Sequence, residues 1–127
     1  LYTADFQKRS GGGQIDLRGL SDVGKYEVAL QLISPERATQ WWSWFRISGV
    51  TCHMLRNHGH CPEARKRIWS AHLAWSSAYP GFNAQENTEL VEKGRDRQVS
   101  SLRMLLNLVC HDNPEATVLE EDLLVDT

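Results

Sequence analysis

Cysteines are few in this 127-residue chain and long apolar runs are missing, and each shortage excludes a class of protein. The three cysteines, Cys52, Cys61 and Cys110, form an odd and sparse set, which argues against a secreted disulfide framework and favours a reducing compartment. The apolar runs at 28–33 and 104–110 are far shorter than the roughly 20 residues of a membrane-spanning helix. We therefore expect no membrane segment and, at the N-terminal end, no signal peptide.

The composition is that of one globular domain, with 41% hydrophobic and 24% charged residues. The net charge of −2 is unevenly spread, because residues 112–127 hold six of the sixteen acidic residues and no base. Ten acids and fourteen bases remain in residues 1–111, a surplus of four positive charges. This organisation predicts a core domain over 1–111 and an acidic C-terminal segment over 112–127 that leads into a tail.

The pattern of apolar residues predicts a mixed α/β or α+β fold, a small sheet with three to four helices packed on it. Alternating apolar residues predict a hairpin of two strands, at 14–18 and 26–34. Proline near a helix start predicts helices from 35 to Gly49 and from 62 to about 77, and core spacing predicts another over 96–109. The stretch 50–54 is ambiguous and favours a strand, and apolar residues within 118–124 fit a small amphipathic helix.

The stretch CHMLRNHGHC, residues 52–61, suggests metal or thiol chemistry. Structural zinc sites usually take four ligands in two spaced pairs, and this stretch offers no regular second pair. The preferred interpretation places Cys52 in the core and makes residues 57–60 an exposed turn, with no metal or other cofactor. The zinc alternative uses four residues: Cys52, His58, Cys61 and Cys110.

No catalytic motif is recognisable. The chain has no serine elbow, no paired set of carboxylates and no HExxH pattern, and a cysteine next to a histidine in sequence does not place the two side chains together. We therefore expect a protein that is not an enzyme.

Five tryptophans are more than one face of a helix can bury. In a helix Trp41 and Phe45 are expected to point inward, with Trp42 as a further candidate for the inner face, while Trp44 points elsewhere. Tryptophan is enriched at interaction hot spots, so Trp44 and Trp69 are the candidate partner-binding residues, with a homodimer as one outcome. The alternative, that all five fill a core, remains open.

Arg65, Lys66 and Arg67 form a basic run, and Lys93, Arg95 and Arg97 form a second group. Such runs are usually solvated helix faces. The functional alternative is contact between Arg65, Lys66 and Arg67 and RNA phosphate or an acidic partner.

The stretches QIDLRGL, YEVALQLIS and WWSWF and the acidic end PEATVLEEDLLVDT resemble the minor core proteins of cystoviruses, the bacteriophages with segmented double-stranded RNA genomes. That resemblance implies a homodimeric core similar to the BRCT fold, located in the virion core or host cytoplasm. It also implies other viral core proteins, such as the polymerase or major capsid protein, as partners. No residue role transfers with it.

The resemblance implies a non-catalytic viral core protein that acts as an assembly cofactor and RNA packaging factor through protein–protein contacts. The alternative is a zinc-stabilised regulatory protein that binds nucleic acid.

Overall fold

The computed structural model describes residues 15–79, 83, 85 and 101–122, and within them the chain is mostly helical. The α-helices are α1 (Asp22–Leu32), α2 (Trp41–His58), α3 (Pro62–Ser76) and α5 (Leu102–Asp112). Short 3-10 helices are η2 (Pro35–Ala38) and η3 (Glu120–Asp122), and two strands, β1 (Ile15–Asp16) and β2 (Ala116–Thr117), complete the elements. The predicted mixed class with a small sheet is confirmed, although the sheet is minimal.

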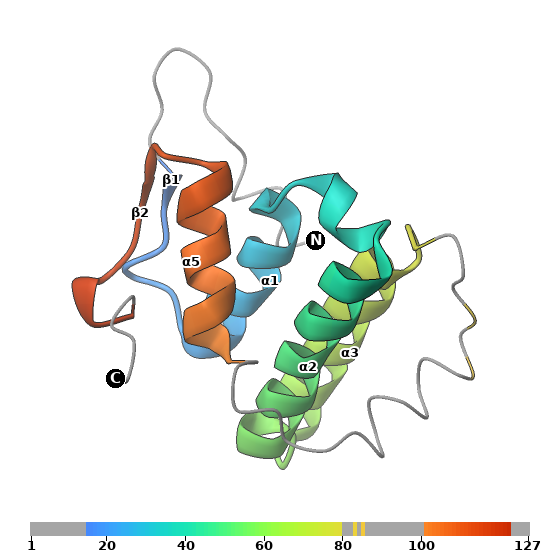
Figure 1. Cartoon of the computed structure of the whole chain (residues 1–127). Helices are drawn as coiled ribbons and strands as arrows, with labels where there is room; N and C mark the ends of the chain where they lie inside the picture. Colours follow the sequence, from blue (N-terminus) through green and yellow to red (C-terminus); the bar gives the residue numbers. More distant parts are fainter. Residues whose placement is uncertain (1–14, 80–82, 84, 86–100, 123–127) are drawn as a thin grey trace.

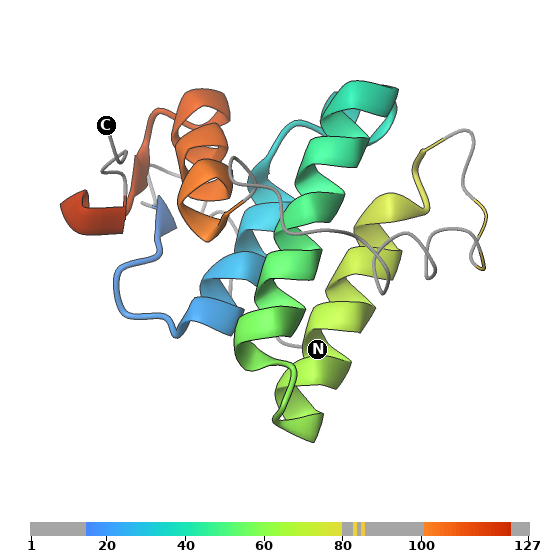
Figure 2. The same ribbon diagram turned by 60° about the horizontal axis from the view of Figure 1, so that its bottom comes forward.

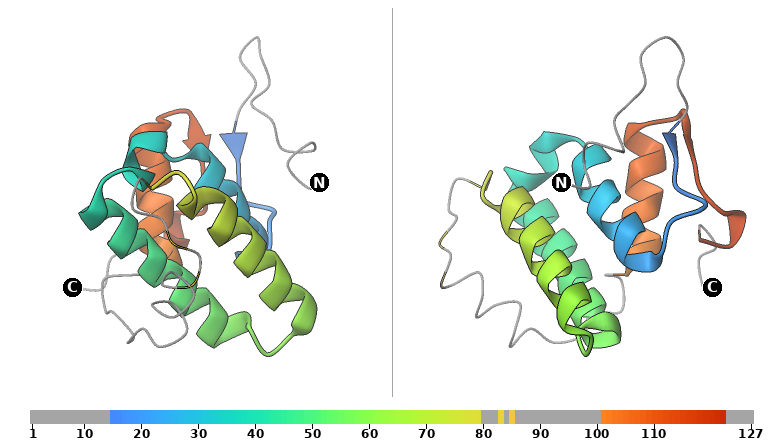
Figure 3. Two further views of the ribbon diagram at one scale, coloured as in Figure 1. Left: turned by 90° about the vertical axis from the view of Figure 1, so that its right-hand side faces the viewer. Right: turned by 180° about the vertical axis from the view of Figure 1, so that it is seen from behind.

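Helices α2 and α3 form an antiparallel pair, and α1 lies between this pair and α5 (Figures 1 and 2). The two strands run parallel on the far side of α5, with Ile15 opposite Ala116 and Asp16 opposite Thr117 (Figure 3). The first and last described segments of the chain therefore lie side by side. In the described part of the chain no helix is long and apolar enough to cross a bilayer.

Helix α1 replaces the strand predicted over 26–34. Its N-terminus is capped by Ser21, whose hydroxyl accepts a hydrogen bond from the Gly24 amide at 3.1 Å. Every residue from Val23 to Leu30 is buried. A helix that is enclosed on all sides has no polar face, so its sequence lacks a 3.6-residue period and its apolar alternation matched a buried strand equally well. The predicted hairpin is wrong too, because β1 pairs with β2.

Helix α2 continues through the two positions at which the sequence predicted a break. Gly49 does not end it, and residues 50–54 are helical, not a strand. A glycine inside a helix costs only about 1 kcal/mol relative to alanine, which the burial of Ile47, Val50 and Met54 easily offsets. The last residue of the helix is His58, and Gly59 caps it. The Leu55 carbonyl oxygen accepts a hydrogen bond from the Gly59 amide, and a Cβ added at Gly59 would collide with this oxygen.

The other predicted helices fare better. Helix α3 begins at Pro62, as the proline predicted, and α5 confirms the part of the predicted 96–109 helix that lies within the described residues. Pro35 starts only the short η2, and α2 begins separately at Trp41. The amphipathic helix expected within 118–124 is reduced to η3, with residues 123 and 124 outside the described residues.

Three buried hydrogen-bonded side chains join the helices. The Tyr26 hydroxyl on α1 lies 2.6 Å from the Thr51 hydroxyl on α2, which lies 2.9 Å from Nδ1 of His72 on α3. All three residues are fully buried. A buried polar group costs stability unless it has a partner, so this chain of contacts favours one rotational setting of the three helices.

The end of α5 is attached to the loop after α1. The Arg37 guanidinium donates to both oxygens of Asp112, at 2.7 and 2.8 Å, and the Ser34 amide donates to the same carboxylate at 2.8 Å. The hydrogen bonds from Arg37 outweigh the effect of burial, and together with the Ser34 amide they lower the pKa of Asp112 from 3.8 to about 2. Helix α5 thus runs across the boundary expected between residues 111 and 112, and the acidic segment up to residue 122 packs on the rest of the fold.

We predict that Asp112→Asn lowers the free energy of unfolding by about 2 kcal/mol at pH 7. The pKa of this carboxylate is depressed in the folded state, so its contribution is present above about pH 4 and is lost as the pH falls towards about 2. Urea unfolding measured between pH 2 and 7 should show the wild-type and variant curves converging over that interval. Asp16→Asn, which breaks an exposed pair with Arg18, should have a much smaller effect. A gap that stays constant with pH would contradict the assignment.

Candidate interaction surface

The five tryptophans divide into buried and exposed ones, but not as the sequence predicted. Trp44 is only 7% exposed: its indole N–H donates to the Ser76 hydroxyl at 2.6 Å, and its ring stacks on Tyr79 at 4.7 Å. The prediction that Trp44 points outward as a partner contact is therefore wrong. Trp69, the other predicted anchor, is half-buried on α3 with its ring edge towards His72.

An exposed group of rings lies at the start of α2, which we call the aromatic cluster: Trp41, Trp42 and Phe45. Trp41 is 47% and Trp42 67% exposed, although Trp41 was expected to point inward. The Trp41 ring stacks on Phe45 with centroids 4.9 Å apart, and Trp42 meets Trp41 edge-on at 4.8 Å. The rings thus hold one another in a fixed arrangement while two indoles face solvent.

The basic run on α3 separates into two kinds of residue. Arg67 donates two hydrogen bonds to the Glu27 carboxylate, which is only 2% exposed on α1. Arg67 therefore has a structural role, although 48% of its side chain remains exposed, and its contact with phosphate or an acidic partner stays a prediction. Arg65 and Lys66 are exposed and form no ion pair within the described ranges. The second basic group, Lys93, Arg95 and Arg97, lies outside the described residues.

The basic run and the aromatic cluster lie at opposite ends of the α2–α3 pair. The two helices are antiparallel, so the start of α3 adjoins the end of α2, about 25 Å along the 18-residue α2 from Trp41. The exposed Trp41 and Trp42 therefore do not lie beside the basic run, whereas the half-buried Trp69 does.

The residues of the stretch 52–61 lie on different parts of the fold. Cys52 is buried on α2, His58 ends α2, and Cys61 is the exposed residue that precedes α3. Cys110 lies on α5, and in the part of the chain that the structure describes no three His, Cys, Asp or Glu side chains are grouped to hold a metal ion. The four proposed zinc ligands are therefore not brought together. The turn expected at 57–60 is shorter, because α2 runs to His58.

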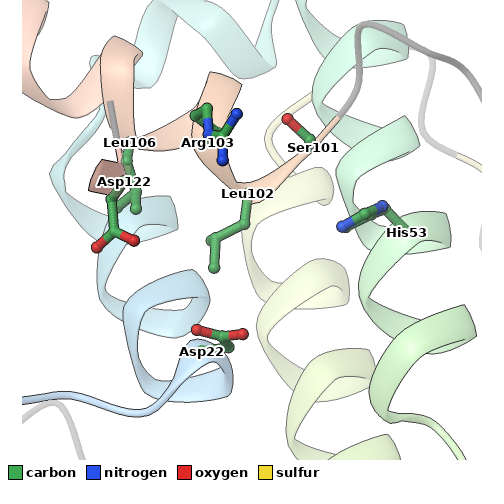
Figure 4. Close-up of a pocket in the computed structure, with 7 residues that line it drawn as sticks. All are labelled: Asp22, His53, Ser101, Leu102, Arg103, Leu106 and Asp122. Atoms are coloured by element: carbon green, nitrogen blue, oxygen red, sulfur yellow. The ribbon is translucent and has the colours of Figure 1, made fainter. Parts of the chain in front are cut away.

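A polar pocket of about 350 Å³ opens where the starts of α1 and α5 approach α2 (Figure 4). Its polar groups already have structural contacts. The Asp122 carboxylate accepts from Lys25 at 2.8 Å, the Ser101 hydroxyl caps α5, and an Asp22 oxygen lies 3.6 Å from Nε2 of His58. His53 and Arg103 also interact with further groups.

The aromatic cluster was not predicted from the sequence. A helical wheel gives the direction of each side chain around the helix, but it does not show whether a neighbouring helix covers that level of the helix axis. Trp41 and Trp42 are the first two residues of α2, and consecutive residues of a helix point about 100° apart. The available signal was the pair itself, because two adjacent tryptophans cannot both face the same core.

Comparison with protein-family models, curated proteins and solved structures finds no match to this chain.

We predict that Arg67→Ala lowers the free energy of unfolding by about 1–3 kcal/mol, because it leaves the buried Glu27 carboxylate without its main partner. Arg65→Ala, two residues away on an exposed position of the same helix, is the matched control and should change stability by less than about 0.5 kcal/mol. Chemical denaturation of both variants measures the difference. Equal losses would contradict a structural role specific to Arg67.

We also predict three distinct thiol reactivities. Cys61 is exposed and should react with a thiol reagent in the native protein, whereas Cys52 is buried and should react only after unfolding. Cys110 should react slowly, because burial raises the pKa of its thiol and so reduces the thiolate fraction. Labelling followed by peptide mass spectrometry assigns each site. Rapid native labelling of Cys52 would contradict its placement in the core.

Proposed function

We propose that this protein is a non-catalytic interaction module that forms a homodimer through its aromatic cluster. The observation that carries the proposal is the exposure of Trp41 and Trp42, 47% and 67%, within a group of rings that already pack on one another. Exposed tryptophans are uncommon on a surface that nothing covers, and tryptophan dominates interaction hot spots.

The area of the cluster suits the centre of a dimer interface. If a whole tryptophan presents about 250 Å², the two indoles expose about 280 Å². A stable interface covers about 800 Å² on each partner, so the cluster supplies about a third, the apolar centre that a polar rim surrounds. Its burial is worth about 7 kcal/mol per copy before the entropic cost of association.

The surroundings of the cluster favour a second copy as its occupant. A two-fold interface brings the same patch of both copies together, so a charged centre would place like charges against each other. The sequence neighbours of the exposed tryptophans are the uncharged Thr39, Gln40 and Ser43, and the exposed Arg46, one turn after Trp42, places a charge at the edge of the patch and not at its centre. Two copies can therefore meet at this patch without repulsion at its centre.

Assembly and RNA packaging in a virion core is the specific role within this proposal. It comes from the cystovirus resemblance, which no comparison supports. Dimerisation is the property that such an assembly cofactor and a general interaction module share, and it is therefore tested first.

Sedimentation velocity over a range of concentrations should give twice the 14.5 kDa chain mass for the wild type. The double variant Trp41→Ala/Trp42→Ala should sediment as a single chain with an unchanged circular dichroism spectrum, because both side chains are largely outside the core. Leu73→Ala, which removes an exposed apolar side chain on α3, is the matched control and should remain dimeric.

A wild type that stays monomeric at all concentrations would refute the dimer, as would a double variant that still dimerises. A monomer whose cluster becomes protected only when another protein is added would assign the surface to that protein instead.

A further inference from the structure

Helix α3 presents a second surface, on the side turned away from α1, which we call the outer face of α3: Arg65, Lys66, Trp69, Ser70 and Leu73. The opposite side of the helix is buried through Ile68, Ala71 and His72. Lys66, Ser70 and Leu73 follow one another at spacings of four and three residues, so they share one stripe, and Arg65 and Trp69 flank it.

The start of this face is positively charged, because Arg65 and Lys66 outnumber Glu63, the acidic residue of the first turn of α3. Arg65 and Lys66 lie in the first two turns of α3, form no ion pair in the described part of the chain and are exposed. The Cys61 side chain makes no capping hydrogen bond to α3. Cations near the positive end of a helix dipole lower its stability, so these two residues act against the helix that carries them.

The second half of the face is apolar. Leu73 is 37% exposed, and the half-buried Trp69 lies one turn before it. About 10 Å, or two turns, separate Lys66 from Leu73. The face therefore changes from basic to apolar along the helix axis over a distance that a short partner helix spans.

We propose that the outer face of α3 binds an acidic amphipathic helix of another protein. Acidic side chains of that helix contact Arg65 and Lys66, and its apolar side chains cover Trp69 and Leu73. Charge complementarity fixes the orientation of the bound helix, and apolar burial supplies most of the affinity. This surface is separate from the aromatic cluster, so the proposal stands or falls independently of the dimer.

An acidic protein helix fits this face better than RNA does. Two exposed cations neutralise few phosphates, and a nucleic-acid site of this size is weak at physiological salt. The Trp69 ring on this face is half-buried, so it offers a base only part of its surface, whereas the exposed Leu73 suits an apolar side chain of a helix.

The test is selection from a phage-displayed library of random 16-residue peptides against the full chain. We expect the selected peptides to be enriched in Asp and Glu one turn from apolar residues. Lys66→Glu and Leu73→Asp should each weaken the binding of a selected peptide by about tenfold in fluorescence anisotropy. Arg18→Glu makes the same charge change as Lys66→Glu at an exposed site in the turn after β1, where it breaks only the exposed pair with Asp16, and it should keep the affinity within about twofold.

Three results would overturn the proposal: selected peptides without acidic enrichment, equal affinity of Lys66→Glu and wild type, or loss of the homodimer in Leu73→Asp, which would make the occupant a second copy. A 20-nucleotide single-stranded RNA serves as the competing probe. RNA binding that depends on Lys66 and not on Leu73, without peptide binding, would assign the basic end to RNA and also overturn it. Circular dichroism and thermal unfolding confirm that each variant is folded.

Discussion

The enclosure of α1 is the constraint on which the rest of the fold depends. Lys25 and Glu27 lie on this buried helix and are only 5% and 2% exposed. An uncompensated buried charge costs several kcal/mol, so each must meet an opposite charge: Lys25 meets Asp122 of η3, and Glu27 meets Arg67 of α3. The two ion pairs fix one element on either side of α1 and leave little freedom for the arrangement of the others.

The sequence predicts a helix well when only one side of that helix is buried and poorly when all of its sides are buried. Pro62 marked the start of α3, and the apolar spacing through Leu105 and Val109 marked α5, because local chemistry and one-sided burial both leave a visible pattern. Helix α1 left none, since it is buried on all sides. The pairing of β1 with β2 joins segments about a hundred residues apart, and no local pattern encodes it.

The candidate surfaces were predicted by residue type better than by position. The sequence directed attention to the tryptophans and to the basic run. It selected Trp44, which is buried, and not Trp42, which is exposed, and it treated Arg67 like Arg65 and Lys66 although Arg67 pairs with Glu27. Whether a helix position is covered depends on where the adjacent helix ends, and whether an arginine is available depends on a glutamate forty residues away. Both facts belong to tertiary structure.

The ion pair between Lys25 and Asp122 can form only late in protein synthesis. Its two residues are 97 positions apart, and a ribosome adding about 5–20 residues per second takes about 5–20 s to cover that interval. During this time Lys25 has been made and its partner has not, so α1 cannot yet take its final surroundings. The burial of Lys25 is therefore one of the last steps in the folding of the chain, because its charge is compensated only once residue 122 has been made.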